Sequence, residues 1–409
     1  MVGIYLLVRA LFLYGFVQDS VSLPSRPSEQ KKEAISKRQQ QVIANEDVSF
    51  GNHGQFFKIK FDGSTYRDCF AASEDMSNER YDIAIVGAPL DTVSAHLDVP
   101  RAPDKVLNFT ANSYSSFFKA TLGRPGARYG PRGIRVASYT SYPRIANVFS
   151  SRHVHGIAPI KLIDCGDVPL AGIDNTLAFK QLEKAHGIIK SYNATIPALS
   201  NTPRVISLGG DHSTTYPALK SAFDRWGQVS VIHFDAHIDT WNPADYENTD
   251  YAKVNHATFL YVAHEEGLIN DASIHVGTRE PIFLEETEIQ NDIKSGFSTI
   301  HGREIDKIGV DGIVEKIRER VGNNKVYISI DIDVLDPTYA PGTGTPAVGG
   351  FTSRELFQIL EGLVGLSIIG ADVVEVSPPF DSRGEITQLA GAGIVNRLVL
   401  MMARSPIPE

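Results

Sequence analysis

The sequence predicts an α/β protein built on a parallel β-sheet that helices cover on both sides. Three observations predict it. From residue 82 onward, apolar runs of strand length alternate with segments of helical spacing. The runs are apolar on both faces, which is typical of strands buried in a parallel sheet. Acidic residues follow these runs rather than precede them, so they lie at the strand ends where such sheets bind ligands.

The predicted elements form one domain over about residues 80–409, because no internal repeat or low-complexity linker divides this region. The predicted strands cover residues 82–89, 160–167, 204–211, 229–236, 273–277, 325–333 and 367–376. The predicted helices cover residues 175–192, 214–226, 308–322, 353–364 and 385–402.

Two predicted regions precede this domain. Residues 1–22 contain an apolar stretch too short to span a bilayer comfortably, followed by small residues, as in a secretory signal peptide. Residues 23–79 form an N-terminal extension. N-glycosylation sequons at Asn108 and Asn193 are compatible with secretion. We therefore expect a protein that is secreted or lies in the secretory pathway, with a cytoplasmic location as the alternative.

The charge balance limits the partners. The net charge is −9 and the pI is about 5.8, and no basic run stands out. These values argue against nucleic acid and against an anionic membrane surface as partners. They are compatible with a cationic or neutral small substrate.

The chain has two cysteines, Cys69 and Cys165, which are too few for a disulfide framework. Cys165 lies in the predicted strand over residues 160–167, so we expect an inert thiol in the core. A single Cys69–Cys165 bridge is the alternative.

The first polar cluster follows the apolar run that begins at Val229. Side chains at alternate positions of an extended chain share one face, so Asp235, His237 and Asp239 are expected to converge at the end of this strand. The alternative is a rim of polar side chains with satisfied hydrogen bonds, in which Asp239 caps the next turn.

A second cluster, Asp331 and Asp333, also ends an apolar run at alternate positions. A parallel sheet would bring it to the same edge as the first, where four carboxylates would repel and raise one another's pKa. Two divalent cations would remove this repulsion, and carboxylate with imidazole ligands suits Mn²⁺ or a similar metal. Asp336, which precedes Pro337, is predicted to shape a turn instead.

The third cluster follows the strand that ends at Gly209-Gly210. His212 lies there at the sheet edge and can supply an imidazole ligand; the alternative is a helix N-terminal residue without a ligand role. Asp211 or Ser213 is predicted to cap the following helix. His233, inside its apolar run, is predicted as a core histidine or a residue behind the ligands.

The predicted ligand set contains two imidazoles and four carboxylates: His212, Asp235, His237, Asp239, Asp331 and Asp333. Such a set suits two cations about 3.5–4 Å apart, which hold a bridging water near a pKa of about 7 and make hydroxide available at neutral pH. The pattern therefore indicates a hydrolase.

These residues stand in motifs that resemble the ureohydrolases, the dimanganese family that includes arginase and agmatinase. The motifs are "GGDHS", "DAHID" and "SIDIDVLDP", and "GAPLDT", "RPGARYGPRGIR", "GTGTP" and "GADVVEVSPPFD" are similar in family order. The resemblance covers roughly residues 80–402. It implies a three-layer α/β/α fold with a mostly parallel, doubly wound sheet of about eight strands. It also implies two Mn²⁺ per subunit, bound by the six residues above, and a homo-oligomer, either a trimer or a hexamer.

By the same resemblance, His256 matches the proton shuttle and Glu375 matches the carboxylate that receives the guanidinium group. The residues alone agree for Glu375, because a carboxylate at a strand end can pair bidentately with a planar cation. Its alternative is a buried structural salt bridge. The residues alone do not distinguish His256 from His264 or His275.

Within the family, "RPGARYGPRGIR" and "DVPLAGID" resemble agmatinase, and "YENTDYAKVNHATF" does not resemble the arginase segment that grips the amino-acid end of arginine. We therefore expect agmatine to be cleaved to putrescine and urea, with 4-guanidinobutanoate or another guanidino acid as the alternative. The hydroxide would attack the guanidinium carbon held by Glu375. Asp239 would take a proton, and His256 would relay one to or from water.

Three features depart from the family pattern. Ala257 stands where the family usually has glycine, Ala347 where it often has an acidic residue, and residues 95–122 separate segments that nearly adjoin in relatives. We interpret residues 95–122 as a surface loop or a translated intron rather than a lid, and we hypothesise that the mature protein lacks them. Two rival functions remain: a one-metal zinc deacylase acting on acetylated polyamines, and a decayed ureohydrolase that binds metal or polyamine without catalysis.

Overall fold

The computed structural model describes residues 61, 65–66, 69–70, 79–92, 123–141, 160–172, 174–245, 253–279 and 286–407. All of these residues belong to one compact unit, Phe50–Glu409. The predicted signal peptide over residues 1–22, the stretch over residues 95–122 and the sequon at Asn108 lie outside the described residues, as does most of the predicted N-terminal extension.

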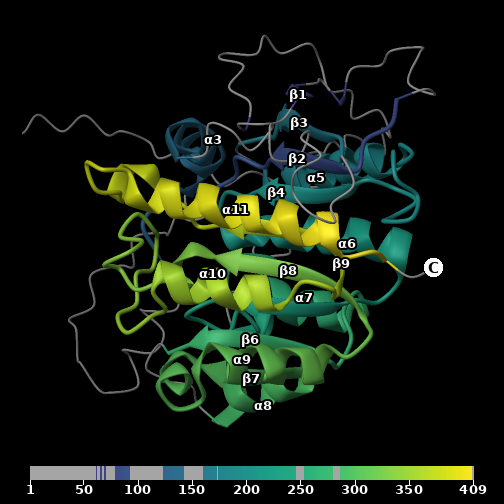
Figure 1. The fold of residues 1–409 in the computed structure, drawn as a ribbon. Helices are drawn as coiled ribbons and strands as arrows, with labels where there is room; N and C mark the ends of the chain where they lie inside the picture. Colours follow the sequence, from purple (N-terminus) through teal and green to yellow (C-terminus); the bar gives the residue numbers. More distant parts are fainter. Residues whose placement is uncertain are drawn as a thin grey trace, which may run out of the picture. The chain divides into compact units, whose positions relative to one another are not determined.

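A parallel sheet forms the centre of this unit (Figure 1). Its strands are β1 (Thr65–Tyr66), β2 (Ile83–Gly87), β3 (Leu162–Asp167), β4 (Arg204–Leu208), β5 (Ser230–Phe234), β6 (Ser273–Thr278), β7 (Phe297–His301), β8 (Lys325–Asp331) and β9 (Ser367–Val374). Their order is β1-β3-β2-β4-β9-β8-β5-β6-β7, and all pairings between them are parallel. Since β1 has two residues, eight longer strands carry the sheet, which confirms the predicted fold.

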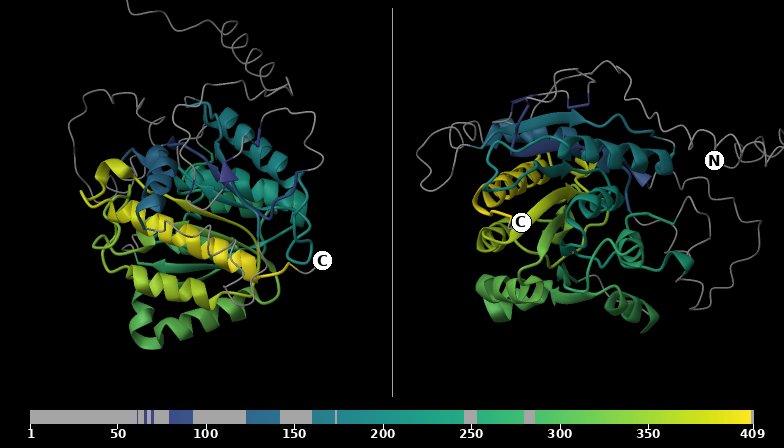
Figure 2. Two further views of the ribbon diagram at one scale, coloured as in Figure 1. Left: turned by 45° about the horizontal axis from the view of Figure 1, so that its top comes forward. Right: turned by 90° about the vertical axis from the view of Figure 1, so that its right-hand side faces the viewer.

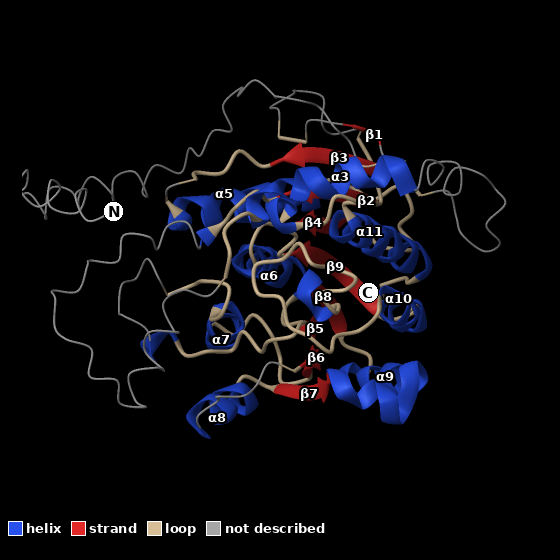
Figure 3. Cartoon of the chain, turned by 90° about the vertical axis from the view of Figure 1, so that its left-hand side faces the viewer, coloured by secondary structure: helices blue, strands red, loops and turns tan. Residues whose placement is uncertain are grey.

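Two layers of helices cover the two faces of the sheet (Figures 2 and 3). One layer contains α3 (Gly130–Ser141), α9 (Ile305–Val321), α10 (Ser353–Gly362) and α11 (Ile386–Arg404), and the other contains α5 (Asn175–Lys190), α6 (Thr215–Trp226), α7 (Phe259–Glu265) and α8 (Glu286–Lys294). In the first layer α11 packs against α3 and α10, and in the second α5 packs against α6. The arrangement is the predicted three-layer α/β/α fold.

Local sequence explains where these elements begin and end. The central strands β2, β4 and β5 are buried along their whole length, which is why their sequences are apolar on both faces. Helix α10 begins with a capping box: Thr352 Oγ1 accepts the N–H of Glu355, and the Glu355 carboxylate accepts the N–H of Thr352. Helix α5 begins at the cap Asp174, whose carboxylate accepts the N–H of Leu177.

The structure contains elements that the apolar runs do not predict. Strand β7 lies at the edge of the sheet and combines two buried with three half-buried residues, so its sequence lacks a continuous apolar run. Helices α3, α7 and α8 were also not predicted; α7 has only 7 residues. The predicted strand over residues 229–236 ends at Phe234, although the N–H of Asp235 still donates to the carbonyl of Val276 on β6 at 3.1 Å.

Helix α11 is apolar on nearly all sides because it lies in the core. Among the described residues it is the one helix long and apolar enough to cross a membrane by length and composition. Most of its residues are buried inside the protein, packed against α3, α10 and β9. Its apolar surface is therefore accounted for by packing.

The favoured prediction for the cysteines, an inert thiol at Cys165 in the core, was wrong. Cys165 on β3 forms a disulfide with Cys69, with their Cα atoms 5.2 Å apart, and both residues are buried. The alternative bridge is the one present. The sequence could not decide between them, because the separation of 96 residues says nothing about whether the two side chains meet.

Candidate metal centre and active site

The predicted site residues, with the exception of His256, lie at the carboxyl ends of four strands that are neighbours in the sheet, in the order β4, β9, β8 and β5. His212 follows β4, Glu375 follows β9, residues 331–333 end β8, and residues 235–239 follow β5. Because these strands are parallel, their ends meet at one edge. Open α/β sheets bind ligands at this edge.

Four buried side chains, here called the inner cluster, direct ligand atoms toward one point: His212, His233, Asp235 and Asp239. His212 Nδ1 lies 3.1 Å from Asp235 Oδ2 and 3.0 Å from Asp239 Oδ2. His233 Nε2 lies 3.1 Å from Asp235 Oδ2 and 3.9 Å from Asp239 Oδ2. Asp331 joins them from β8, with its Oδ2 3.3 Å from His212 Nδ1.

Three side chains form a second group, here called the outer cluster: Asp235, His237 and Asp333. His237 Nδ1 lies 3.0 Å from Asp235 Oδ1 and 3.2 Å from Asp333 Oδ2. The two carboxylates are buried, whereas the His237 side chain is 28% exposed, so this cluster is nearer to solvent. Asp235 belongs to both clusters, with Oδ2 facing the inner one and Oδ1 facing the outer one.

The ligand atoms in both clusters fit divalent cations. Atoms bound to one ion at about 2.1 Å lie about 3.0–3.4 Å from one another, and most of the distances above are in this range. His212 Nδ1, His233 Nε2 and Asp235 Oδ2 are buried without a hydrogen-bond partner. Buried polar atoms of this kind are costly, and a cation shared among them would satisfy all three.

Three carboxylates of the site have raised pKa values, whereas the pKa of Asp235 lies well below its usual value because the charge of His233 and hydrogen bonds from His212, His233 and His237 outweigh its burial. Burial, followed by the charge of Asp235, raises the pKa of Asp239 to about 6. Burial and the charges of Asp333 and Asp235 raise the pKa of Asp331 well above its usual value. Burial and the charge of Asp331 have the same effect on the pKa of Glu375. The repulsion expected from the sequence is therefore present, and bound cations would relieve it.

The backbone around the ligands adopts conformations that L-residues rarely use. Asp239 has a φ of 51° and Glu375 a φ of 60°, both in the left-handed region. Each such residue costs on the order of 1–3 kcal/mol and persists where the surroundings enforce it, often at functional sites. After β5, the N–H of His237 donates to Asp235 Oδ1 at 2.6 Å, which holds the carboxylate within the turn.

A hydrogen-bond network behind His212 fixes which of its nitrogens faces the site. Ser329 donates its hydroxyl proton to Asp372 Oδ1 at 2.7 Å, so its oxygen accepts the N–H of His212 Nε2 at 2.8 Å. His212 Nδ1 therefore presents a lone pair to the inner cluster. Asp372 is itself held by Thr215 and Tyr327, each at 2.8 Å.

Ser329 and Asp372 were not among the predicted site residues. Both are buried polar residues inside predicted strands, and this was the available signal, because such groups need partners. The sequence could not name those partners, since Ser329 is on β8 and Asp372 on β9.

Glu375 is buried beside His212. Its Oε1 accepts the backbone N–H of His212 at 2.8 Å, and its own N–H donates to the carbonyl of Gly210 at 2.9 Å. A Cβ at position 344 would lie 3.3 Å from Glu375 Oε2, so Gly344 leaves room at that oxygen. Gly210 is required for a similar reason: a Cβ there would overlap the carbonyl of Leu90.

His256 lies in a turn that is bound to the residues following the inner cluster. The N–H of Trp241 donates to the carbonyl of Ala257 at 3.0 Å, and the N–H of Leu260 donates to the carbonyl of Asp239 at 3.2 Å. His264 instead pairs with the exposed Asp271 at 3.0 Å. The structure therefore distinguishes His256, whose turn is bound to the residues after the inner cluster, from His264, which pairs with an exposed carboxylate; the sequence alone did not distinguish them.

A loop containing the motif "GTGTP" contacts the outer cluster. Thr345 Oγ1 donates to Asp333 Oδ2 at 3.0 Å, so Thr345 is a site residue that the sequence did not single out. Ala347 is buried, and its carbonyl accepts the guanidinium of Arg279 at 2.8 Å. Ala257, the other departure from the family pattern, is buried as well.

Two structural roles expected from the sequence are confirmed. Asp211 caps the short helix after β4 by accepting the N–H of Ser213. Asp336 shapes a turn by accepting the N–H groups of Thr338 at 2.9 Å and Gly349 at 2.8 Å. Both carboxylates are thereby used by the backbone.

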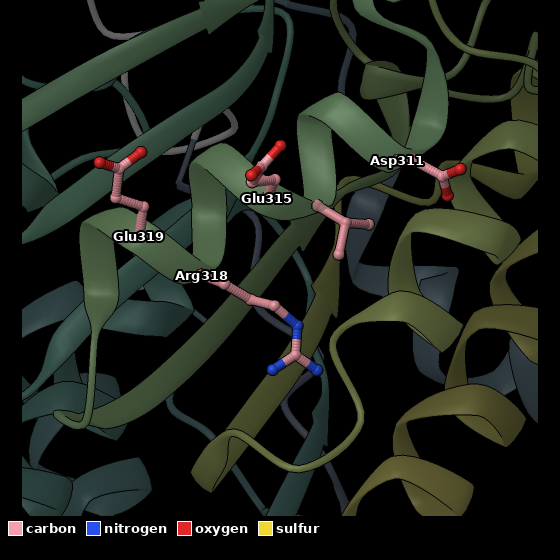
Figure 4. A pocket seen from close by; sticks show the side chains of 5 residues that line it. Asp311, Glu315, Arg318 and Glu319 are labelled. Atoms are coloured by element: carbon pink, nitrogen blue, oxygen red, sulfur yellow. The ribbon is translucent and has the colours of Figure 1, made fainter.

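A shallow hollow also lies over helix α9 (Figure 4). It is lined by Asp311, Val314, Glu315, Arg318 and Glu319, which follow one another on a single helix face. None of these residues belongs to either cluster. The hollow is a charged, solvent-facing surface of helix α9.

The comparisons with known proteins agree on one family. The Arginase family matches residues 81–401. The chain is 40% identical over 348 residues to "Putative agmatinase 1" of Schizosaccharomyces pombe, covering 81% of this chain and 79% of that protein. It is 37% identical over 287 residues to the agmatinase of Neisseria meningitidis, covering 69% and 83%. The solved proclavaminate amidino hydrolase of Streptomyces clavuligerus has a TM-score of 0.63 and 28% identity, covering 86% of this chain and 99% of that one.

The fold and the buried His/Asp site define a metal-dependent hydrolase of the ureohydrolase class. The chain belongs to the arginase family. It is an agmatinase-like enzyme that acts on a guanidino C–N bond.

Proposed function

We propose that this protein hydrolyses agmatine to putrescine and urea with two bound divalent cations, Mn²⁺ being the metal. The observation that carries the proposal is the division of Asp235 between the two clusters, one oxygen facing each. A carboxylate shared by two ions is a feature of two-metal hydrolases. The names of the relatives from Schizosaccharomyces pombe and Neisseria meningitidis support agmatine as the substrate.

Six residues would hold the cations: His212, Asp235, His237, Asp239, Asp331 and Asp333. The inner ion would lie among His212, Asp235 and Asp239, with Asp331 beside them, and the outer ion among Asp235, His237 and Asp333. Two ions bound there would supply hydroxide at neutral pH for attack on the guanidinium carbon.

The side chains around the ions would bind substrate and move protons. Glu375 would bind the guanidinium group through charge-assisted hydrogen bonds, with Oε1 kept in place by the His212 N–H. Asp239 would take a proton during the attack on the substrate. His256 would carry a proton between the site and solvent as the amine leaves, because its turn adjoins the residues after Asp239.

A guanidino acid such as 4-guanidinobutanoate is the second candidate substrate. The side chain of Arg124 is exposed and lies 5.1 Å from the centre of the Phe380 ring. The N–H of Arg124 donates to the carbonyl of Gly344 at 3.1 Å, and Gly344 adjoins Glu375. The backbone of Arg124 thus lies near Glu375, and a guanidinium carried on this segment would favour an anionic tail on the substrate.

Urea release from a panel of guanidines tests the proposal. Metal-stripped protein would be reloaded with Mn²⁺ and assayed with agmatine, 4-guanidinobutanoate and arginine. We expect agmatine to give the highest kcat/KM and two Mn²⁺ to bind per subunit. A single bound ion would favour the zinc deacylase, and two bound ions without urea from any guanidine would favour the decayed binding protein.

We also propose that the protein is secreted and forms a trimer or hexamer. The Cys69–Cys165 disulfide supports secretion, because disulfides persist mainly in oxidising compartments. The sequon residue Asn193 is exposed, as a glycosylation site must be. Detection of the glycosylated protein in the culture medium and light scattering of the purified protein test the two statements; protein confined to the cytosol, or a monomer, would contradict them.

A further inference from the structure

A chain of hydrogen-bonded side chains runs from the inner cluster to helix α8. His233 Nδ1 and His275 Nδ1 are 2.8 Å apart, and His275 Nε2 is 2.9 Å from Asp292 Oδ1. The register of β5 and β6 pairs His233 directly with His275. His233 and His275 have 0% exposed surface and Asp292 has 8%. The mechanism above uses none of these three residues.

The donors and acceptors of this chain can be assigned in order. The Asp292 carboxylate only accepts, so His275 Nε2 donates to it. In a neutral His275 ring, Nδ1 is then an acceptor, and His233 Nδ1 donates to it. The other nitrogen of His233, Nε2, is therefore left with a lone pair.

This lone pair faces the inner cluster. His233 Nε2 is 3.1 Å from Asp235 Oδ2, yet both atoms are buried without a hydrogen bond. His212 Nδ1 presents a further lone pair 3.1 Å from the same oxygen, because its Nε2 N–H is bound by Ser329. Acceptors packed this closely repel one another, and a cation among them turns the repulsion into attraction.

We propose that His233 is an additional ligand of the inner cation, and that His275 and Asp292 are positioning residues that hold its lone pair toward the ion. The proposal rests on the metal centre of the proposed function and is independent of the substrate. Partners of this kind behind a ligand histidine fix its tautomer and ring orientation and typically change metal affinity about 10- to 100-fold.

Asp292 also reaches the inner cluster by a second route. Its Oδ1 accepts the hydroxyl of Thr240 at 2.8 Å, and Thr240 directly follows Asp239. The backbone of Asp239 is in the left-handed region, with a φ of 51°, and needs such support. One carboxylate on α8 thus supports two inner-cluster residues, His233 and Asp239.

The test measures metal binding without substrate. Mn²⁺ would be titrated into metal-stripped wild type, His233→Phe, His275→Phe and Asp292→Asn by calorimetry, and Co²⁺ absorption spectra would be recorded. The inner site is identified as the one that Asp239→Asn loses. We expect His233→Phe to weaken it at least 10-fold and to alter the Co²⁺ spectrum, and His275→Phe and Asp292→Asn to weaken it about 10-fold, with the outer site unchanged.

A matched control is another buried histidine with no connection to the clusters. His186 on α5 is 2% exposed, and its Nε2 is 3.2 Å from Ser207 Oγ. We expect His186→Phe to keep both affinities. Phenylalanine at position 275 retains stacking on Phe297, whose ring centre is 4.0 Å away, and Asp292→Asn keeps the volume, so these two variants report on the chain even if His233→Phe fails to fold.

An inner-site affinity within twofold of wild type in His233→Phe would overturn the ligand assignment. A wild-type affinity in both His275→Phe and Asp292→Asn would overturn the positioning role. Protein that binds two cations with the expected pattern but releases no urea would refute the proposed substrate chemistry and leave this proposal standing.

Discussion

Replacing Asp235 by asparagine should remove both bound cations, because this carboxylate is the one group common to the two clusters. Its Oδ2 lies 3.1 Å from His212 Nδ1 and its Oδ1 lies 3.0 Å from His237 Nδ1. Asparagine keeps the volume and one acceptor but loses the charge. In contrast, Asp239 belongs only to the inner cluster and Asp333 only to the outer one, so Asp239→Asn and Asp333→Asn should each lose one cation.

The expected magnitude follows from linkage between binding and folding. One ion at a free concentration 100 times its Kd stabilises the folded state by about 2.7 kcal/mol, so two sites contribute about 5.5 kcal/mol. For a chain of this size each kcal/mol raises the Tm by about 2 °C, so saturating Mn²⁺ should raise the Tm of the wild type by about 10 °C. The single-site variants should show about half of this rise and Asp235→Asn almost none.

Differential scanning calorimetry of metal-stripped protein with and without Mn²⁺ measures the rise, and mass spectrometry counts the bound metal. Asp82→Asn is the matched control: Asp82 is also buried, but it accepts the backbone N–H groups of Lys161 and Ile196. This variant should unfold at a lower temperature and keep the full rise with Mn²⁺. A wild-type rise and two ions per subunit in Asp235→Asn would refute the assignment of the shared carboxylate.

Four further outcomes are expected. The folded-state pKa of Asp239 is about 6 against 3.8 in the unfolded chain, so the metal-free fold holds the extra proton in this window and its stability falls as the pH rises from about 4 to about 6; Asp239→Asn should flatten this slope in urea titrations, and an unchanged slope would contradict it. Glu375→Gln should retain both metals and lower kcat/KM about 10- to 150-fold, because a charge-assisted hydrogen bond contributes about 1.5–3 kcal/mol; wild-type kinetics would exclude the guanidinium contact. Replacing Cys69 and Cys165 together by alanine should lower the free energy of unfolding by about 4.7 kcal/mol, since the bond closes a loop of 96 residues, and an unchanged urea midpoint would argue against the bond. Native material should contain no tryptic peptides within residues 100–119, and their detection by mass spectrometry would show that the hypothesis of a missing insertion is wrong.

Much of the fold could be predicted from the sequence, because strands and helices each produce a characteristic local pattern of apolar residues. The strands β2, β4 and β5 are central and buried on both faces, so each leaves an unbroken apolar run. Edge strand β7 and the short helix α7 leave weaker patterns, because three of the five β7 residues are only partly buried and α7, with 7 residues, is too short to show a period. Strand order is a non-local property, and no run by itself indicates its neighbours.

The site divides in the same way. The alternate spacing of Asp235, His237 and Asp239 already predicted that three side chains meet at the end of a strand, although the structure brings them together in the turn after β5 rather than along the strand. Three-dimensional neighbours determined the rest. Ser329 on β8 orients His212 after β4, and Thr345 reaches the outer cluster from a separate loop. Such contacts join residues that are far apart in the sequence, so no local sequence pattern predicts them.

The sequence by itself determined the candidate residues for the chemistry, because polar side chains that directly follow apolar runs lie at strand ends. Only the tertiary structure decided how they divide: the order β4-β9-β8-β5 brings the strand ends together, and Asp235 turns one oxygen toward each cluster. It also places His233, expected from the sequence as a core histidine or a residue behind the ligands, in the inner cluster itself. The physical reason is that a strand's periodicity is local, whereas a cation site is made of atoms about 3 Å apart from strands that only the sheet brings together.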